Sequence, residues 1–240
     1  MARYPTKAPL DSSADSGGVA AVDRALLVLS AFSEGDRALT LHELAERTQL
    51  VKSTLLRLLA SLQHFGFIQR MPGGAYSLGT AICRLHGVYT ASFGLDTVVP
   101  PALRALVDKT RESASFHVQQ GDTRVTLFRV NSPQPLSDQS RAGDSLPLRR
   151  GSGGHVLLAF SGARGALHER IRKDKVVALV GDRVPELAGI SAPVFEAGGH
   201  LVGALTLTMP KERYTERHIP VVRAAAAALS SQLGAEFDSA

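Results

Sequence analysis

A glycine-rich segment, Gly-Ser-Gly-Gly at residues 151–154, is the clearest place in this sequence where backbone groups could bind a ligand. An apolar run at 154–160 follows it and fits a helix, so the amides of Ser152 and Gly153 would lie at a helix N-terminus. Unpaired N–H groups and the positive end of the helix dipole favour an anion at such a position. The same residues also fit an ordinary flexible turn.

Hydroxyl and guanidinium groups elsewhere could complete an anion site. Thr206 and Thr208 are two residues apart, so on a strand predicted at 201–209 they point to one face and can donate hydroxyl hydrogens. They are equally ordinary strand residues. Four arginines could supply charge to a carboxylate, namely Arg129, Arg141, Arg149 and Arg150. His117, on a predicted strand, fits a structural histidine better than a ligand-binding one.

Signatures of enzymes are missing. Val156 replaces the third glycine of a dinucleotide fingerprint, and Arg150 before Gly151 breaks the Gly-x-Ser-x-Gly pattern around Ser152. A single cysteine, Cys83, excludes an intrachain disulfide and a Cys-based zinc site. We therefore expect no enzyme, no catalytic residue, no metal and no cofactor.

Length and charge indicate two domains and a nucleic-acid partner. The chain has 240 residues and a net charge of +5. Residues 47–95 contain no Asp or Glu but several basic residues, so a phosphate backbone can approach this segment without repulsion. Residues 1–18 are predicted to be a disordered tail and not a signal peptide. No apolar run is near 18 residues, so we expect no membrane partner, and the single cysteine fits a reducing cytoplasm.

The basic segment lies in a pattern of elements typical of a winged helix-turn-helix. Apolar periodicity predicts three helices, at 19–32, 41–48 and 52–64. Two short strands at 67–71 and 75–78 flank the turn Pro72-Gly73-Gly74. Thr40 with Glu43 forms a capping box before the second helix. Three helices followed by a hairpin predict a DNA-binding domain over residues 19–78.

The outer face of the third helix would enter the major groove, with the hairpin against the DNA backbone. The DNA-contact candidates are Thr40, Lys52, Ser53, Thr54, Arg57 and, on the wing, Arg70. Ser53 could instead be only a helix cap and Arg57 only a solvated side chain, so each assignment alone is about as good as its structural alternative.

The rest of the chain predicts a linker and a second domain. A helix within 79–94 would be the linker, and residues 95–240 would form an α+β domain on an antiparallel sheet. We predict a helix with Pro100 and Pro101 in its first turn and its end near 111. The other predicted elements are strands at 115–119, 125–130, 190–195 and 201–209 and helices at 154–160, 163–172 and 215–237.

Two sets of motifs in this order and spacing resemble IclR-type (isocitrate lyase regulator) transcription factors. The first set is Val22-Asp23-Arg24-Ala25-Leu26, Val51-Lys52-Ser53-Thr54, Arg57-Leu58-Leu59 and Tyr76-Ser77-Leu78-Gly79. The second is Leu146-Pro147-Leu148, Gly154, Leu157-Leu158-Ala159, Ile190-Ser191-Ala192-Pro193-Val194 and Gly203-Ala204-Leu205-Thr206-Leu207. The resemblance covers about residues 19–237. Gln49 departs from it, because the family usually has Gly at this turn, and Arg149-Arg150 stands where His-Ala is usual.

The resemblance implies a winged helix-turn-helix, a linker helix and a GAF-like effector domain that work as a homodimer or a dimer of dimers. It also implies a pocket for a small organic acid, lined by Ser152, Gly153, Asp182, Gly189, Ile190, Thr206 and Thr208.

The expected function is that of a repressor that binds a palindromic double-stranded operator and responds to the acid. The alternative is a winged-helix adaptor for protein contacts, or a small-molecule-binding module, without DNA binding; a salt-dependent gel shift separates the cases.

Overall fold

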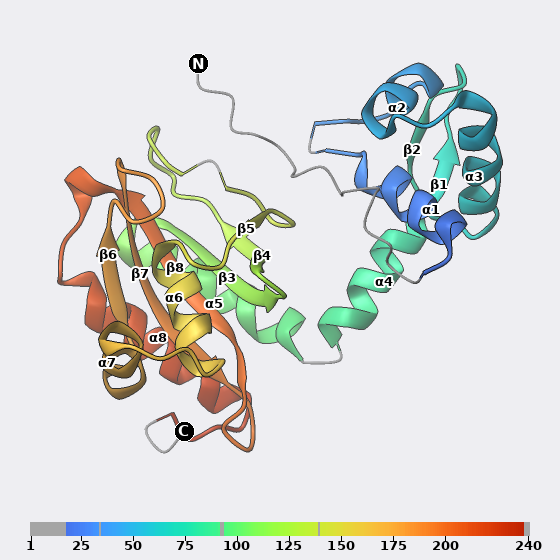
Figure 1. The fold of residues 1–240 in the computed structure, drawn as a ribbon. Coiled ribbons are helices and arrows are strands. Elements are labelled where there is room, and N and C mark those ends of the chain that lie inside the picture. Colours follow the sequence, from blue (N-terminus) through green and yellow to red (C-terminus); the bar gives the residue numbers. More distant parts are fainter. Residues whose placement is uncertain (1–17, 34, 92–93, 139, 238–240) are drawn as a thin grey trace. The chain divides into compact units, whose positions relative to one another are not determined.

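The computed structural model describes residues 18–33, 35–91, 94–138 and 140–237 (Figure 1). It consists of two compact units, Met1–Tyr89 and Thr90–Ala240, and each is described by itself below. The predicted disordered tail lies outside the described residues, apart from Gly18.

The first unit contains four helices and a two-stranded hairpin in its described part. Its elements are α1 (Ala20–Ser30), α2 (Leu41–Thr48), α3 (Lys52–His64), β1 (Ile68–Arg70), β2 (Tyr76–Leu78) and α4 (Thr80–Ala91). The order agrees with the winged helix-turn-helix pattern, and the bounds of α2 and α3 are those predicted. α1 is shorter than predicted, because it ends at Ser30 and not at residue 32.

Local interactions explain why α2 and α3 form where they do. The Thr40 hydroxyl accepts a hydrogen bond from the Glu43 amide (3.2 Å), and the Glu43 carboxylate accepts one from the Thr40 amide (2.7 Å), so the predicted capping box is present. Leu44, Leu55 and Leu59 are fully buried in the core between the helices and the hairpin. This packing leaves the opposite face of α3 exposed.

The turn between α2 and α3 uses a left-handed residue that is not glycine. Gln49 has φ 57° and ψ 20°, and its side-chain amide donates to the carbonyl of Glu46 (2.5 Å). The turn therefore places Gln49 in the left-handed region, at the position where the resemblance implies Gly, with the steric cost of a Cβ there.

The second unit is a six-stranded antiparallel sheet with helices on both faces (Figure 1). The strand order is β5-β4-β3-β8-β7-β6. The strands are β3 (Ser113–Gln120), β4 (Thr123–Val130), β5 (Ser145–Pro147), β6 (Val177–Val180), β7 (Leu187–Phe195) and β8 (Leu201–Pro210). The helices are α5 (Leu95–Thr110), α6 (Gly151–Phe160), α7 (Ala166–Asp174), the short η1 (Lys211–Arg213) and α8 (His218–Gln232).

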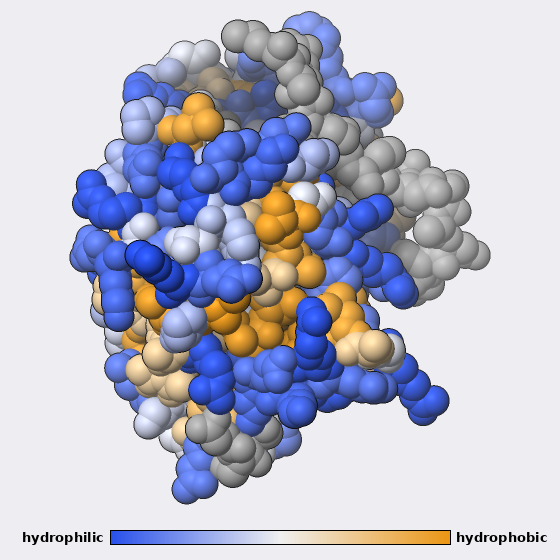
Figure 2. Space-filling view, turned by 90° about the vertical axis from the view of Figure 1, so that its left-hand side faces the viewer, coloured by the Kyte–Doolittle hydropathy of each residue, from blue (hydrophilic) through white to orange (hydrophobic). Residues whose placement is uncertain are grey.

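The two faces of the sheet are covered by different helices. One apolar cluster joins alternate residues of β7 and β8, such as Ile190 and Leu207, to α5 and α8. A second, smaller cluster contains Val156 and Leu157 of α6 and Ile171 of α7 and lies on the other face. On the side of this unit that carries β6, α7 and α8, apolar residues gather at the centre of a mostly hydrophilic surface (Figure 2). No helix within the described ranges is long and apolar enough to cross a membrane.

Several predicted bounds in the second unit are wrong. α5 begins at Leu95, so Pro100 and Pro101 lie inside the helix and not in its first turn. The prediction used proline as a mark of helix starts, but Leu95 and Val99 are buried and fix the preceding turn. α6 begins at Gly151 and not at 154, and the edge strands β5 and β6 were not predicted. α8 is shorter than the predicted 215–237.

Candidate functional site

A polar pocket lies in the second unit between the sheet and the first turn of α6. It holds about 440 Å³ of empty space, part of which is open to solvent. Its lining comes from all six strands of the sheet, from α6, from the loop before β5 and from the segment after β6. A sheet face under a helix is usually apolar, so this concentration of polar side chains indicates a binding site.

A row of hydroxyl and guanidinium groups crosses four strands at this face. Ser115 of β3 is paired with Arg129 of β4 on one side and with Thr206 of β8 on the other, and Thr206 is paired with Ser191 of β7. Hydrogen bonds join the hydroxyls of Ser152 and Ser191 (2.7 Å) and of Ser191 and Thr206 (2.8 Å). The first turn of α6 is therefore fastened to the sheet through hydroxyl groups.

Arg124 of β4 is the cation that lies deepest in the site. It is 3% exposed, and its Nη1 donates to the carbonyls of Pro147 (2.7 Å) and Arg150. Its Nε has no hydrogen-bond partner among the described residues. Burial lowers the pKa of Arg124 to about 10, so the group is still charged at neutral pH.

The glycines of α6 make room for this guanidinium group. A Cβ on Gly154 would lie 2.6 Å from Nη1 of Arg124 and 2.1 Å from the Leu148 carbonyl oxygen. A Cβ on Gly151 would lie 3.0 Å from Nη2, and one on Gly153 would lie 2.8 Å from the Thr206 hydroxyl. The glycine-rich segment thus allows a close approach between a helix terminus, an arginine and a strand.

A second charged cluster in the pocket consists of Asp138 and the side chains that bind it. The Asp138 carboxylate accepts hydrogen bonds from Arg183 (3.0 Å) and Ser140 (2.7 Å) and has a longer contact with Arg129 (3.5 Å). Burial alone would raise the pKa of Asp138, but Arg183, Ser140 and Arg129 outweigh it and hold the pKa below its ordinary value. Asp138 is therefore ionised and bound to two of the three pocket arginines.

Asp182 caps α6 at the position where the sequence suggested a ligand. Its Oδ2 accepts a hydrogen bond from the Gly151 amide (2.5 Å) and lies 3.4 Å from Nε2 of His155. Asp182 lines the pocket, as the resemblance implied, but its carboxylate already occupies part of the helix N-terminus. Burial lowers the pKa of His155, and Asp182 opposes this effect only in part.

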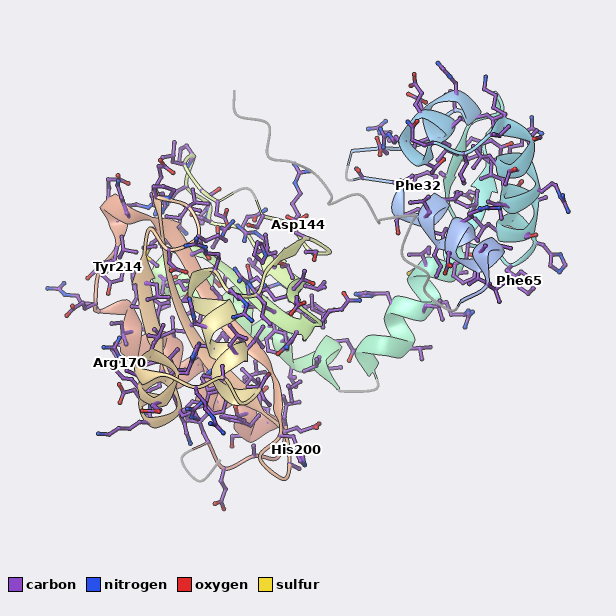
Figure 3. All side chains as sticks on the ribbon, viewed as in Figure 1. Phe32, Phe65, Asp144, Arg170, His200 and Tyr214 are labelled. Carbon is purple, nitrogen blue, oxygen red and sulfur yellow. The ribbon has the colours of Figure 1, made fainter. Side chains whose placement is uncertain are left out.

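His117 is an uncharged part of the lining. It is 4% exposed, and its Nδ1 lies 3.2 Å from the Thr126 hydroxyl. Burial, followed by the nearby charge of Arg124, lowers the pKa of His117 well below its ordinary value. The loop before β5 is held beside β4, because the Thr126 amide of β4 donates a hydrogen bond to the carbonyl of Asp144 (2.9 Å). Asp144 is labelled in Figure 3.

The structure brings together most of the residues that the sequence suggested for the pocket. Those that line it are Ser152, Gly153, Asp182, Gly189, Thr206, Thr208 and Arg129. Ile190 does not, because strand alternation directs it to the opposite face of β7, where it is fully buried in the core. Three of the four arginines suggested as charge donors are exposed and do not line the pocket, namely Arg141, Arg149 and Arg150.

Arg124 and Arg183 were missed by reasoning from the sequence. The strand was predicted to start at Val125, which put Arg124 in a turn, but β4 starts at Thr123. Arg183 lies in a short segment after β6 that had no predicted element. The alternation of polar residues at 113, 115 and 117 with apolar ones at 114, 116 and 118 was visible, but it does not distinguish a pocket from solvent.

In the first unit, the suggested DNA-contact residues lie on the surface of α3 and the hairpin. Lys52, Ser53 and Arg57 are exposed on α3, Thr54 is half-buried, and Arg70 is exposed on β1. The Thr40 hydroxyl is used in the capping box, so a DNA contact there would come from the same side chain that caps α2. Phe65, 69% exposed just after α3, is labelled in Figure 3.

Among the residues that the structure describes, no group of three or more His, Cys, Asp or Glu side chains could hold a metal ion. The chain thus presents a winged helix-turn-helix in one unit and a polar ligand pocket in the other. This combination is that of a DNA-binding protein with a separate ligand-binding domain.

Comparisons with known families agree with this class. Residues 21–72 match the IclR helix-turn-helix domain, and residues 87–179 match the bacterial transcriptional regulator IclR C-terminal domain. The two matches together span more than half of the chain, and it belongs to the IclR family of transcriptional regulators. Asp182, Arg183, Thr206 and Thr208 of the pocket lie beyond the second matched segment.

Individual relatives are similar over nearly their full length. The HTH-type transcriptional regulator KdgR of Escherichia coli is 26% identical over 257 residues, covering 95% of this chain and 97% of KdgR. The Pca regulon regulatory protein of Pseudomonas putida is 24% identical over 260 residues, covering 95% and 89%. The structure of an IclR homolog from Microbacterium hydrocarbonoxydans, complexed with 4-hydroxybenzoate, has a TM-score of 0.80 at 22% identity and covers 89% and 99%, which shows a shared fold.

Proposed function

We propose that this chain represses transcription by binding a palindromic operator and that a small organic acid in the pocket of the second unit controls its operator affinity. The observation that carries the proposal is the polar pocket with three arginines, in a chain that also has an exposed helix-turn-helix face. Anionic ligands fit such a lining, because guanidinium groups recognise carboxylates by paired charge-assisted hydrogen bonds.

For the DNA half of the function, the proposal assigns α3 to the major groove and the hairpin to the DNA backbone. The candidates are Thr40, Lys52, Ser53, Thr54, Arg57 and Arg70. α3 has no acidic residue, and its first turn carries Lys52, so it can approach phosphates without like-charge repulsion.

A second copy of the chain is part of this proposal, because one winged module contacts too little DNA for tight, specific binding. Exposed apolar side chains on α1, on the residue that caps its N-terminus and on α4 support self-association of the first unit. They are Val19, Val22, Leu26, Leu85 and Val88. A two-fold dimer would read two half-sites and so a palindrome, and a dimer of dimers is the larger assembly of the same kind. Sedimentation showing a monomer with full operator affinity would contradict this part.

For the effector half, the lining assigned to the ligand is Ser152, Gly153, Asp182, Gly189, Thr206 and Thr208, with Ile190 left out. Binding by a native-state ligand raises thermal stability by mass action, so a thermal-shift screen can find the acid. The 4-hydroxybenzoate bound by the homolog from Microbacterium hydrocarbonoxydans makes that acid the first probe.

The proposal is tested by selecting binding sites from random double-stranded DNA and then measuring affinity for the selected site with and without the acid. We expect a palindromic site, a steep loss of affinity with salt, and a change in affinity when the acid is added. In a reporter strain the selected site should lower transcription in the presence of the chain. An adaptor or a ligand-binding module without DNA binding would select no sequence even at low salt.

A further inference from the structure

The Nε of Arg124 is an orphaned hydrogen-bond donor in the most buried part of the pocket. The residue is 3% exposed, and its other guanidinium end is held by the carbonyls of Pro147 and Arg150. Neither Nε nor Nη2 donates a hydrogen bond to any described residue. A buried donor without a partner is costly, so its presence needs an explanation, and a bound ligand that accepts its hydrogen bond is one.

The surroundings of Arg124 make this cost larger. Gly151, Gly153 and Gly154 of the first turn of α6 lie against its guanidinium group, so the positive end of a helix dipole faces a positive side chain. The two carboxylates of the pocket are engaged elsewhere: Asp138 with Arg183 and Asp182 with the Gly151 amide. Arg124 forms no ion pair with any described carboxylate.

The charges of the lining indicate how many negative charges a ligand should bring. Three guanidinium groups (Arg124, Arg129 and Arg183) face two carboxylates (Asp138 and Asp182). His117 adds no charge because it is uncharged at neutral pH. The lining therefore carries one positive charge in excess, and Arg124 is the arginine of the three that has no described carboxylate within ion-pair distance.

We propose that the Nε–Nη2 edge of Arg124 is the carboxylate-binding subsite of this pocket and that the ligand is a monocarboxylate. This inference rests on the proposed function, because it assigns the charge that holds the effector. A carboxylate accepts two parallel hydrogen bonds from this edge of a guanidinium group. A dicarboxylate would bring a second negative charge toward Asp138, whose own partners are already in place, and a neutral amide would leave Arg124 without a counter-charge.

The subsite differs from the one that the sequence suggested. The glycine-rich turn was expected to bind the anion with its own amides, but the Gly151 amide already donates to Asp182. In this arrangement the glycines admit the arginine, and the arginine binds the anion.

The test uses the full chain and two matched sets of probes at constant ionic strength, measured by calorimetry and by thermal shift. One set is 4-hydroxybenzoate, 4-hydroxybenzamide and terephthalate, and the other is acetate, acetamide and succinate. Within at least one set we expect the monocarboxylate to bind at least about tenfold more tightly than its amide and its dicarboxylate, since one unpaired charge is at stake. The probe set needs no variant, so the comparison holds even where a substitution disturbs folding.

Two variants identify the residue. Arg124→Lys keeps the charge and a donor for the Pro147 and Arg150 carbonyls but removes the two-donor edge, so monocarboxylate affinity should fall at least about tenfold. Arg149→Gln removes an exposed arginine outside the lining and should change affinity less than twofold. In the parent chain, the ¹⁵Nε–H resonance that disappears in Arg124→Lys should shift when the monocarboxylate is added.

The proposal is overturned by equal affinity in the parent and a folded Arg124→Lys variant, by an amide or dicarboxylate that binds as tightly as the monocarboxylate, or by the absence of binding in both sets. The proposed function fails differently, when a bound acid leaves operator affinity unchanged or when the chain selects no DNA. The two failures are therefore separable.

Discussion

Replacing Asp182 by Asn tests whether this carboxylate is a helix cap or a ligand contact. Asn keeps the size and one acceptor oxygen but removes the charge that faces the N-terminus of α6 and the Gly151 amide. A charge at a helix N-terminus contributes about 0.3–1 kcal/mol, and a charge-assisted hydrogen bond is about twice as strong as a neutral one. Because Asp182 is partly exposed, we expect a loss of about 1 kcal/mol for the second unit.

The assay is thermal or urea unfolding at neutral pH, followed with a probe in the second unit, because the two units can unfold in separate transitions. A loss of about 1 kcal/mol corresponds to a fall in Tm of roughly 2–4 °C for a chain of this size. Asp122→Asn is a matched control, since Asp122 is exposed in the turn between β3 and β4.

The same variant has an opposite consequence for ligand binding. Removing a negative charge from the lining makes the pocket more positive, so an anionic ligand should bind Asp182→Asn at least as tightly as the parent, and up to about tenfold more tightly. Weaker binding of the ligand by Asp182→Asn would mean that Asp182 contacts the ligand directly, as the family resemblance implied. Unchanged stability would instead refute the capping role.

Three further predictions address the DNA surface, the turn and the pH dependence. Arg57→Ala should cost about 1–3 kcal/mol of specific binding if Arg57 reaches a base edge, and Lys52→Ala should weaken binding to all sequences and flatten the salt slope by about one unit; gel shifts over a salt series measure both. Gln49→Gly should leave stability nearly unchanged in urea unfolding, whereas Gln49→Val should cost about 1–2 kcal/mol, because a β-branched residue fits the left-handed region poorly. The depressed pKa of His117 means that only the unfolded state takes up its proton near pH 6.5, so stability should fall by up to about 1.4 kcal/mol per pH unit as the pH drops below that value, and His117→Gln should flatten this slope.

The first unit could be predicted closely because its elements depend on local patterns. The leucines of α3 repeat with the helical period, and Thr40 with Glu43 fixes the start of α2. Such interactions join residues three or four apart, so they are visible in the sequence without knowledge of the fold. The left-handed conformation of Gln49 was not predicted, because its residue type departs from the Gly usual at this turn.

The pocket could be predicted only in part, because its charges meet through long-range pairing. Arg124 reaches the carbonyl of Arg150 across 26 positions, and Arg183 reaches Asp138 across 45. No spacing rule links such residues. The family resemblance pointed to Thr206 and Thr208, and strand alternation put them on one face, but neither pointed to Arg124 or Arg183. Ile190 shows the limit of transfer from a family, since one step along β7 moves a side chain from the pocket to the core.

The polar lining of the pocket suggests how binding of an anion could favour one conformation of the second unit. The sheet face toward α5 and α8 is apolar, whereas the face under α6 holds, next to a helix N-terminus, an arginine whose Nε has no hydrogen-bond partner among the described residues. An anion bound to Arg124, as we propose, would relieve the repulsion between this arginine and the helix terminus only while α6 and β4 keep their present spacing. Any conformation that moves α6 away from Arg124 would therefore bind the anion less well. Under the proposal, this difference in affinity is the free energy available for control of a distant site.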